Sequence, residues 1–326
     1  MPAFLTHRSF ALRLLGSHPE LSEKAFLLGS QGPDPYFFFG QLPWKKREGA
    51  KEVAAFGSEL HHIDPASYFA SLLAKAAEAN SKSFTSYLYG LGAHYCLDRT
   101  AHPFVFGRTG FSDDKKLNGR LSHDHTLLEV LIDEAIATGD DTYTPYAYRY
   151  IDLEAKEAYE ISARLYEATA AYLGERKIPG LGPSSLAEAL DDYRAVLKIT
   201  NKPRWFSKFF VDLAMGRESQ VAALHYPSKA AREDLEIELS KNDYDILNEE
   251  HFPWPEPYSG KERSESFLDL YEKAAGEAGV LFDLFARFLK GEAPDLASFT
   301  AGLTHDGGTA GAKMAHFESI FRLIKQ

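Results

Sequence analysis

Residues 83–102 read SFTSYLYGLGAHYCLDRTAH, and this stretch predicts a helix that Pro103 would end. The helical period recurs almost throughout the chain, and the sustained period-2 alternation expected of strands is absent. We therefore predict an all-α fold, a multi-helix bundle with additional C-terminal helices. The other expected helices cover residues 4–15, 48–61, 65–80, 122–135, 153–174, 184–199, 203–224, 229–247, 263–290 and 309–325, with a polar loop over 106–120.

The domain organisation can be estimated from length and from one proline-rich segment. The chain has 326 residues, 44% hydrophobic and 25% charged, which is an ordinary globular composition. This length suggests about two domains, and the segment over 248–262 could mark a boundary between them. Helices on both sides of it carry apolar stripes that need partners, however. We therefore expect a single large helical domain over 1–326, with the chemically informative residues in 1–140.

Charge and cysteine content narrow the classes of function. The 36 basic and 47 acidic residues give a net charge of −11, which argues against a nucleic-acid scaffold and against docking on anionic membranes. The sequence contains no run of about 18 apolar residues, so it predicts no membrane span. The N-terminus lacks the pattern of a secretion signal. The lone cysteine, Cys96, excludes an intramolecular disulfide. We expect a cytoplasmic protein in which Cys96 is a buried core residue.

Histidine placement is the most informative feature of the sequence. His94, Asp98 and His102 follow one another at intervals of four residues, so one side of a helix can present all three. His125 and Glu129 have the same spacing. Each pair alone is also compatible with an ion pair on a helix surface.

Further candidates complete the set: His7 on the first helix, Asp34 in a Gly-Pro-Asp-Pro-Tyr loop, and His61 at a helix end. Zinc prefers imidazole and carboxylate ligands, and a hydrolytic site with two metals needs roughly six to eight of them. A polar set of this size within apolar helices predicts a metal centre. His62 and His123 remain alternatives to His61 and His125 as ligands.

In the order and approximate spacing of these residues, the chain resembles the zinc-dependent phospholipase C family, whose bacterial members and nuclease relatives are all-helical zinc phosphodiesterases. The resemblance covers residues 1–140 and implies roughly two to three zinc ions. It assigns the ligands in three sets: Asp34, His61, His94 and Asp98 for one ion, His102, His125 and Glu129 for the second, and His7 with the amino terminus for a third, which Asp98 would bridge to the first. The family's secreted enzymes begin with a tryptophan whose backbone binds metal, whereas this sequence begins Met1-Pro2.

Such a set of ligands supports a specific reaction. Bound zinc would lower the pKa of a water molecule to about 7, and the resulting hydroxide would attack the phosphorus of a phosphodiester. Asp34, on a loop near the ions, could also act as general base. The substrate would be a small phosphodiester or a lipid head group. The aromatic run 36–39 could line a pocket for an apolar part of the substrate or pack in the core.

Two other classes of function stay open. An HD-type metal phosphohydrolase would need an adjacent His-Asp pair, for which His123 and Asp124 are the candidates. A helical binding protein that keeps a metal site without turnover is the second. The remaining C-terminal histidines are expected to be structural or exposed: His225, His251, His305 and His316. The role of residues 150–326 and the oligomeric state stay open.

Overall fold

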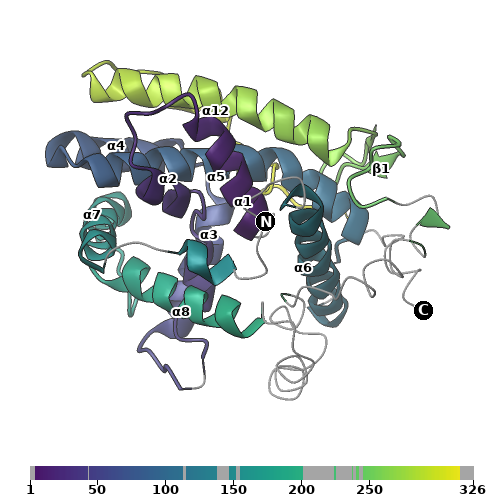
Figure 1. Ribbon diagram of the computed structural model, residues 1–326, viewed down its shortest axis with the longest axis horizontal. Helices are drawn as coiled ribbons and strands as arrows, with labels where there is room; N and C mark the ends of the chain where they lie inside the picture. The colour runs from purple at the N-terminus through teal and green to yellow at the C-terminus, as the bar shows by residue number, and fades with distance from the viewer. Residues whose placement is uncertain are drawn as a thin grey trace.

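Helices form almost all of the regular structure in the computed structural model of the chain (Figure 1). The structure describes residues 4–42, 44–112, 115–137, 147–151, 155–200 and 245–315, with the single positions 224, 237, 240 and 241. Strands within these ranges amount to one short antiparallel pair, β1 (Trp254–Pro255) and β2 (Glu262–Arg263). The prediction of an all-α fold is therefore confirmed.

The described helices follow one another as α1 (Phe4–Leu15), α2 (Glu23–Gly29), the 3₁₀ helix η1 (Asp34–Phe38), α3 (Ala50–His62), α4 (Ala66–Ala79), α5 (Lys82–Thr109), α6 (Lys115–Ala137), the 3₁₀ helix η2 (Ala147–Tyr150), α7 (Ala155–Leu173), α8 (Ser185–Thr200), α12 (Phe267–Leu289) and α13 (Leu296–Thr300). The helices predicted over 4–15, 153–174, 184–199 and 263–290 match α1, α7, α8 and α12 to within a few residues. Those predicted over 203–224 and 229–247 lie almost entirely outside the described residues.

The helix predicted over 309–325 is wrong for residues 309–315, and the rest of that range lies outside the described residues. Leu303 and Thr309 form an antiparallel bridge that folds this part of the chain into a turn. Gly307 and Gly311 have φ angles of 80° and 81°, a conformation that glycine adopts readily and that interrupts a helix. The turn therefore replaces the start of the expected helix.

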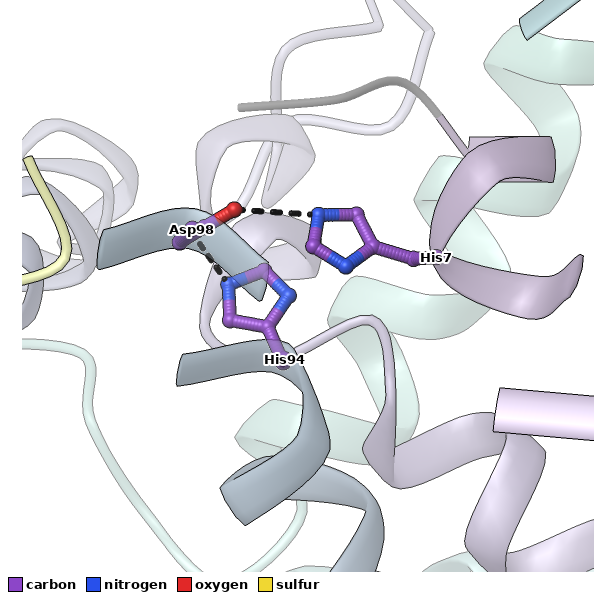
Figure 2. A group of neighbouring side chains, drawn as sticks. All are labelled: His7, His94 and Asp98. Atoms are coloured by element: carbon purple, nitrogen blue, oxygen red, sulfur yellow. Dashed lines mark ion pairs between the residues drawn. The ribbon is translucent and has the colours of Figure 1, made fainter. Parts of the chain in front are cut away.

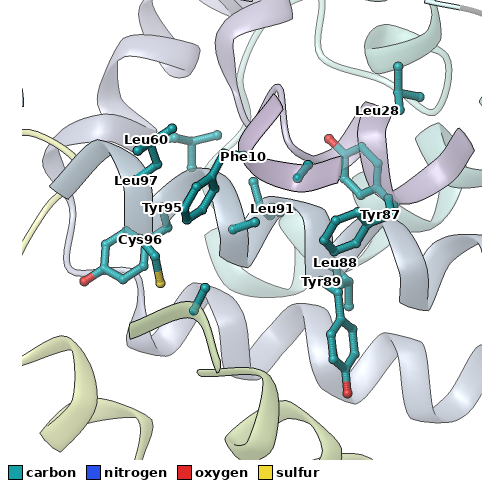
Figure 3. Packing of buried hydrophobic residues seen from close by; sticks show 14 of the residues in the cluster. Phe10, Leu28, Leu60, Tyr87, Leu88, Tyr89, Leu91, Tyr95, Cys96 and Leu97 are labelled. Atoms are coloured by element: carbon teal, nitrogen blue, oxygen red, sulfur yellow. The ribbon is translucent and has the colours of Figure 1, made fainter. Parts of the chain in front are cut away.

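Helix α5 is the central element of the fold. It spans 28 residues, and nearly every side chain along it is buried. In Figure 1, α12 runs alongside α5, and both helices pack closely together. Figure 3 shows part of the apolar core around α5, including Tyr87 and Tyr95. The prediction that Cys96 is a buried core residue is confirmed, and its burial raises the pKa of its thiol to about 12.

Two glycines allow α2 to lie directly on α5. A Cβ at Gly90 would lie 2.1 Å from the carbonyl oxygen of Phe26, and one at Gly29 would lie 2.0 Å from that of Tyr87. Any larger residue would push the two helices apart, because a close-packed interior leaves no room for the added atom. This contact also fixes Ser30, the residue directly after α2, beside α5.

Helix α5 continues through Pro103, so the predicted helix end at that residue is wrong. Proline removes the N–H group that would bond to the carbonyl of Arg99. The turn at Gly307 packs against α5 at this carbonyl. A Cβ added to Gly307 would lie 2.7 Å from the Arg99 oxygen and 2.4 Å from Pro103 Cγ. Packing on several sides of α5 therefore outweighs the local preference for a helix end.

The polar loop predicted over 106–120 is also mostly helical. Residues 106–109 belong to α5 and residues 115–120 to α6. Ser122, the first residue of the helix predicted over 122–135, instead lies inside α6, where its carbonyl accepts a hydrogen bond from the hydroxyl of Thr126 at 3.1 Å. The helix predicted over 122–135 therefore lies within α6 but is shorter than the observed helix.

The proline-rich segment over 248–262 packs on the central helix. Trp254 of β1 is 3% exposed, and its ring meets that of Phe104 edge to face at 5.5 Å between centroids. This contact and the packing of α12 on α5 agree with one large domain, and the division of the chain into domains stays a prediction. None of the helices in the described ranges is both long and apolar enough to cross a membrane.

Candidate metal centre

One side of α5 carries three polar side chains at intervals of about one turn. His94, Asp98 and His102 are 0%, 0% and 2% exposed. Buried ionisable groups are tolerated when they are paired, hydrogen-bonded or bound to a metal ion. The spacing read from the sequence thus places three candidate ligands side by side in the interior.

A first group of candidate ligands joins α1 to α5 (Figure 2). His7 Nε2 lies 3.2 Å from Asp98 Oδ1, and His94 Nε2 lies 2.9 Å from Asp98 Oδ2. The rings of His7 and His94 stack with their centroids 4.2 Å apart. One carboxylate is therefore shared between two imidazoles that come from different helices.

A second group brings α3 and η1 to the same place. Asp34 is the first residue of η1, and His61 lies in the last turn of α3. Asp34 Oδ1 is 3.1 Å from His61 Nε2 and 3.8 Å from His94 Nε2. His94 thus faces both Asp34 and Asp98, and it links the second group to the first.

A third group lies one turn further along α5 and includes two residues of α6. His125 Nε2 is 2.9 Å from Glu129 Oε1, and His102 Nε2 is 3.9 Å from the same oxygen. The rings of His102 and His125 are 5.8 Å apart between centroids. The two i, i+4 patterns of the sequence therefore meet across the contact between α5 and α6.

Backbone carbonyls orient three of the imidazoles. In each of them Nδ1 donates to a carbonyl oxygen: His61 to Gly57 at 2.8 Å, His94 to Ser30 at 3.0 Å, and His102 to His305 at 2.7 Å. A carbonyl oxygen can only accept, so Nδ1 carries the proton and the lone pair remains on Nε2. Histidines that bind metals are typically held in this way.

The donor set fits zinc. Each of the three groups offers three ligand atoms within 4.8 Å of one another, all of them imidazole nitrogens or carboxylate oxygens. His7 Nε2, His94 Nε2 and both Asp98 oxygens are buried without a hydrogen-bond partner among the described residues, although the two nitrogens lie at ion-pair distance from the carboxylate. A cation placed among these atoms would satisfy them together.

Burial and neighbouring charges set the ionisation of these groups. Burial would raise the pKa of Asp98, but the surrounding imidazoles, His94 first, hold that pKa well below 3.8. Burial would lower the pKa of His94, yet the carboxylates of Asp98 and Asp34 outweigh it and raise that pKa above 6.5. Burial and the neighbouring His94 lower the pKa of His7. Asp98 and His7 are thus in the forms that bind a metal ion, and His94 would release a proton on binding.

The structure separates His61 from its neighbour His62. His61 is buried and faces Asp34, whereas the side chain of His62 is 62% exposed. Adjacent helical residues point about 100° apart, and His62 Nε2 lies 3.2 Å from Asp306 Oδ2 instead of facing Asp34. His61 is therefore the residue that joins the second group.

His125 rather than His123 belongs to the third group. His123 Nδ1 lies 3.4 Å from Asp124 Oδ1, and neither of these two residues belongs to a group of candidate ligands in the described ranges. Among the described residues, the adjacent His-Asp pair considered for an HD-type phosphohydrolase therefore lies outside the three groups of candidate ligands.

A buried carboxylate on α6 holds the start of α1. Asp133 is 0% exposed, and its two oxygens accept hydrogen bonds from the backbone N–H groups of Leu5 and Thr6 at 2.8 and 2.7 Å. These N–H groups have no partner within the helix. The contact fixes α1, and with it His7, against the rest of the centre. The amino terminus, expected as a further ligand, lies outside the described residues.

The aromatic run 36–39 serves mainly as core. Tyr36 and Phe39 are buried, and Phe38 stacks on Tyr193 with centroids 4.4 Å apart. Phe37 differs, because it is half-buried and stacks on the ring of His61 at 5.3 Å. Only Phe37 among them adjoins a candidate ligand in this way.

The sequence missed two residues of the centre, His305 and Asp306. His305 is buried, with its ring 5.1 Å from that of His61, so it is not the exposed histidine that was one of its two expected roles, and it lies beside a candidate ligand. Asp306 Oδ1 lies 3.4 Å from His102 Nδ1. The available signal was a second His-Asp dipeptide beside two glycines. The other C-terminal histidine in the described ranges, His251, is exposed as expected.

Comparison with known proteins agrees with this geometry. The family model for zinc-dependent phospholipase C matches residues 1–175, which is more than half of the chain. All eight candidate ligands lie within the matched range, whereas His305 and Asp306 lie beyond it. No curated protein and no solved structure matches the chain.

Proposed function

The chain belongs to the zinc-dependent phospholipase C family, and from this we propose that it hydrolyses phosphodiesters with water activated by zinc. The observation that carries the proposal is the meeting of eight candidate ligands, from five separate helical elements, in three adjoining groups: His7, Asp34, His61, His94, Asp98, His102, His125 and Glu129. Helical proteins do not gather buried histidines and carboxylates in this way without a compensating partner.

The proposed centre holds roughly two to three zinc ions. Asp34, His61 and His94 would hold one, and His102, His125 and Glu129 a second. Support for this division comes from the two sets being separate groups, each with its own carboxylate. His7 would hold a third ion, and Asp98 would bridge to it, which its contact with both His7 and His94 favours.

Bound zinc would supply a Lewis acid that lowers the pKa of a water molecule and offsets the negative charge of the phosphoryl group. Asp34 is the residue we assign as general base. Its Oδ1 faces His61 and His94, which leaves Oδ2 to accept the proton of the attacking water. A carboxylate at the start of a short 3₁₀ helix can face both the ligands and incoming substrate.

The substrate class we propose is a small phosphodiester or the head group of a phospholipid. Support for an apolar portion comes from Phe37, which is half-buried beside His61 and could pack against a lipid or an aromatic group. The net charge of −11 gives no general attraction to anionic membranes, so access to lipid would depend on local contacts.

The proposal can be tested with Asp34→Asn on two substrates, bis-p-nitrophenyl phosphate and phosphatidylcholine vesicles. We expect the zinc-loaded wild type to hydrolyse at least the first and the variant to be slower by about a hundredfold or more. His251→Gln is the matched control, because His251 is 55% exposed and pairs with Asp269 away from the candidate ligands. Equal rates in wild type and Asp34→Asn would contradict the assignment of Asp34.

A further inference from the structure

A turn late in the chain packs against the candidate ligands. Residues 301–310 are folded back on themselves by the bridge between Leu303 and Thr309. The hydroxyl of Tyr95, on α5, donates a hydrogen bond to the carbonyl of Leu303 at 2.8 Å. The turn is thereby fastened to α5, and it places His305 at the centre.

The main chain of His305 contacts two of the candidate ligands. Its N–H donates to the carbonyl of His61 at 3.1 Å, and its carbonyl accepts from Nδ1 of His102 at 2.7 Å. The ring lies among other imidazoles, 5.1 Å from His61 and 5.6 Å from His94 between centroids. Hydrogen bonds of the main chain of His305 therefore hold its ring next to the candidate ligands His61 and His94.

The imidazole of His305 lacks a partner. Both ring nitrogens are inaccessible and make no hydrogen bond within the described part of the chain, and the residue is 5% exposed. Buried polar atoms without partners are rare and costly, so such a group usually marks a place where something else binds. His305 belongs to none of the three groups of candidate ligands in the described ranges.

We propose that His305 donates a hydrogen bond to an anionic oxygen of the phosphoryl group bound at the centre. The inference rests on the proposed function, because it requires a phosphate or phosphodiester next to Asp34, His61 and His94. A neutral imidazole keeps one N–H donor whichever nitrogen carries the proton. A hydrogen bond to an anion is roughly twice as strong as one to a neutral acceptor, so His305 would contribute substantially to binding.

A small cavity provides the competing explanation. It has a volume of about 20 Å³ and is lined mostly by apolar and aromatic side chains together with His305. A water molecule needs roughly 10–15 Å³, so one water could satisfy a ring nitrogen instead. Removal of the imidazole would then leave the binding of anions unchanged.

The test measures the binding of inorganic phosphate to zinc-loaded protein by isothermal titration calorimetry, with zinc per chain determined on the same samples. His305→Phe keeps a ring and removes both nitrogens, and His305→Gln restores an N–H donor. We expect His305→Phe to retain the wild-type zinc content and to bind phosphate about tenfold more weakly or worse. His305→Gln should recover part of this loss, and the exposed-site control His251→Gln should show none.

Two results would overturn the inference. One is a phosphate affinity of His305→Phe within about twofold of wild type, which would favour the buried water. The other is loss of zinc from His305→Phe, which would make His305 a ligand or a support for ligands. A wild type that takes up no zinc, or that binds no phosphate when loaded, contradicts the proposed function itself. If His305→Phe does not fold, His305→Leu replaces it and must show the same loss.

Discussion

His94 Nε2 lies 2.9 Å from Asp98 Oδ2, one turn away on the same helix, and neither side chain is exposed. The other oxygen of Asp98 lies 3.2 Å from Nε2 of His7 on α1. A single buried carboxylate thus joins the N-terminal helix to the central one. A zinc centre at this place would convert a costly set of buried polar atoms into a stabilising one.

Zinc binding should weaken as the pH falls. The pKa of His94 is raised above 6.5, so in the metal-free protein this imidazole is protonated below that raised pKa and a proton competes with zinc for Nε2. Asp98 stays ionised, because its pKa is held well below 3.8. We expect the affinity for zinc to fall by about tenfold or more between about pH 8 and about pH 6. Competition with a chromogenic chelator measures it, and a constant affinity over that range would be inconsistent with a ligand role for His94.

Asp133, which accepts hydrogen bonds from the start of α1, should stabilise the protein more than an exposed ion pair between α1 and α12. Asp133→Ala leaves the N–H groups of Leu5 and Thr6 buried without their acceptor, which should cost about 1–3 kcal/mol or more in the free energy of unfolding. Glu272→Gln is the control, because the pair of Glu272 with Arg13 of α1 is exposed and worth about 0–1 kcal/mol. Urea unfolding of both variants measures the difference, and equal losses would refute the anchoring role of Asp133.

Substitution of glycine by alanine should have opposite effects at two positions, one in the contact between α2 and α5 and one on the exposed side of α12. Gly90→Ala would place its Cβ 2.1 Å from the carbonyl oxygen of Phe26, and we expect it to destabilise the fold by about 1–3 kcal/mol or more. Gly276 of α12 is exposed and has no atom near its added Cβ, so Gly276→Ala should stabilise by about 0.5–1 kcal/mol. Thermal unfolding compares them, and a neutral Gly90→Ala would contradict the close approach.

Much of the centre was predictable because helical spacing is a local property. The i, i+4 relation of His94 to Asp98 holds in any α-helix, and the structure keeps it. The bounds of α1 follow from its apolar periodicity and from Gly16 just beyond them. The choice between His61 and His62 was beyond local reasoning, because it depends on which side of α3 faces the core.

The errors came from long-range contacts. Pro103 reads as a helix end, yet α5 continues because the turn at Gly307 packs against it. His305 is 203 positions from His102, whose ring donates to its carbonyl. No spacing rule connects residues that far apart, so only the tertiary structure brings His305 to the centre.

Elemental analysis of protein purified without added metal or a histidine-rich tag tests the zinc centre most directly. We expect roughly two to three zinc ions per chain in the wild type, and a loss of at least one ion in the double variant His94→Ala/Asp98→Ala, which lacks both central ligands. Wild-type protein that holds no zinc, even after incubation with the metal, would contradict the proposed centre. A zinc content that is unchanged in the double variant would contradict the assignment of His94 and Asp98.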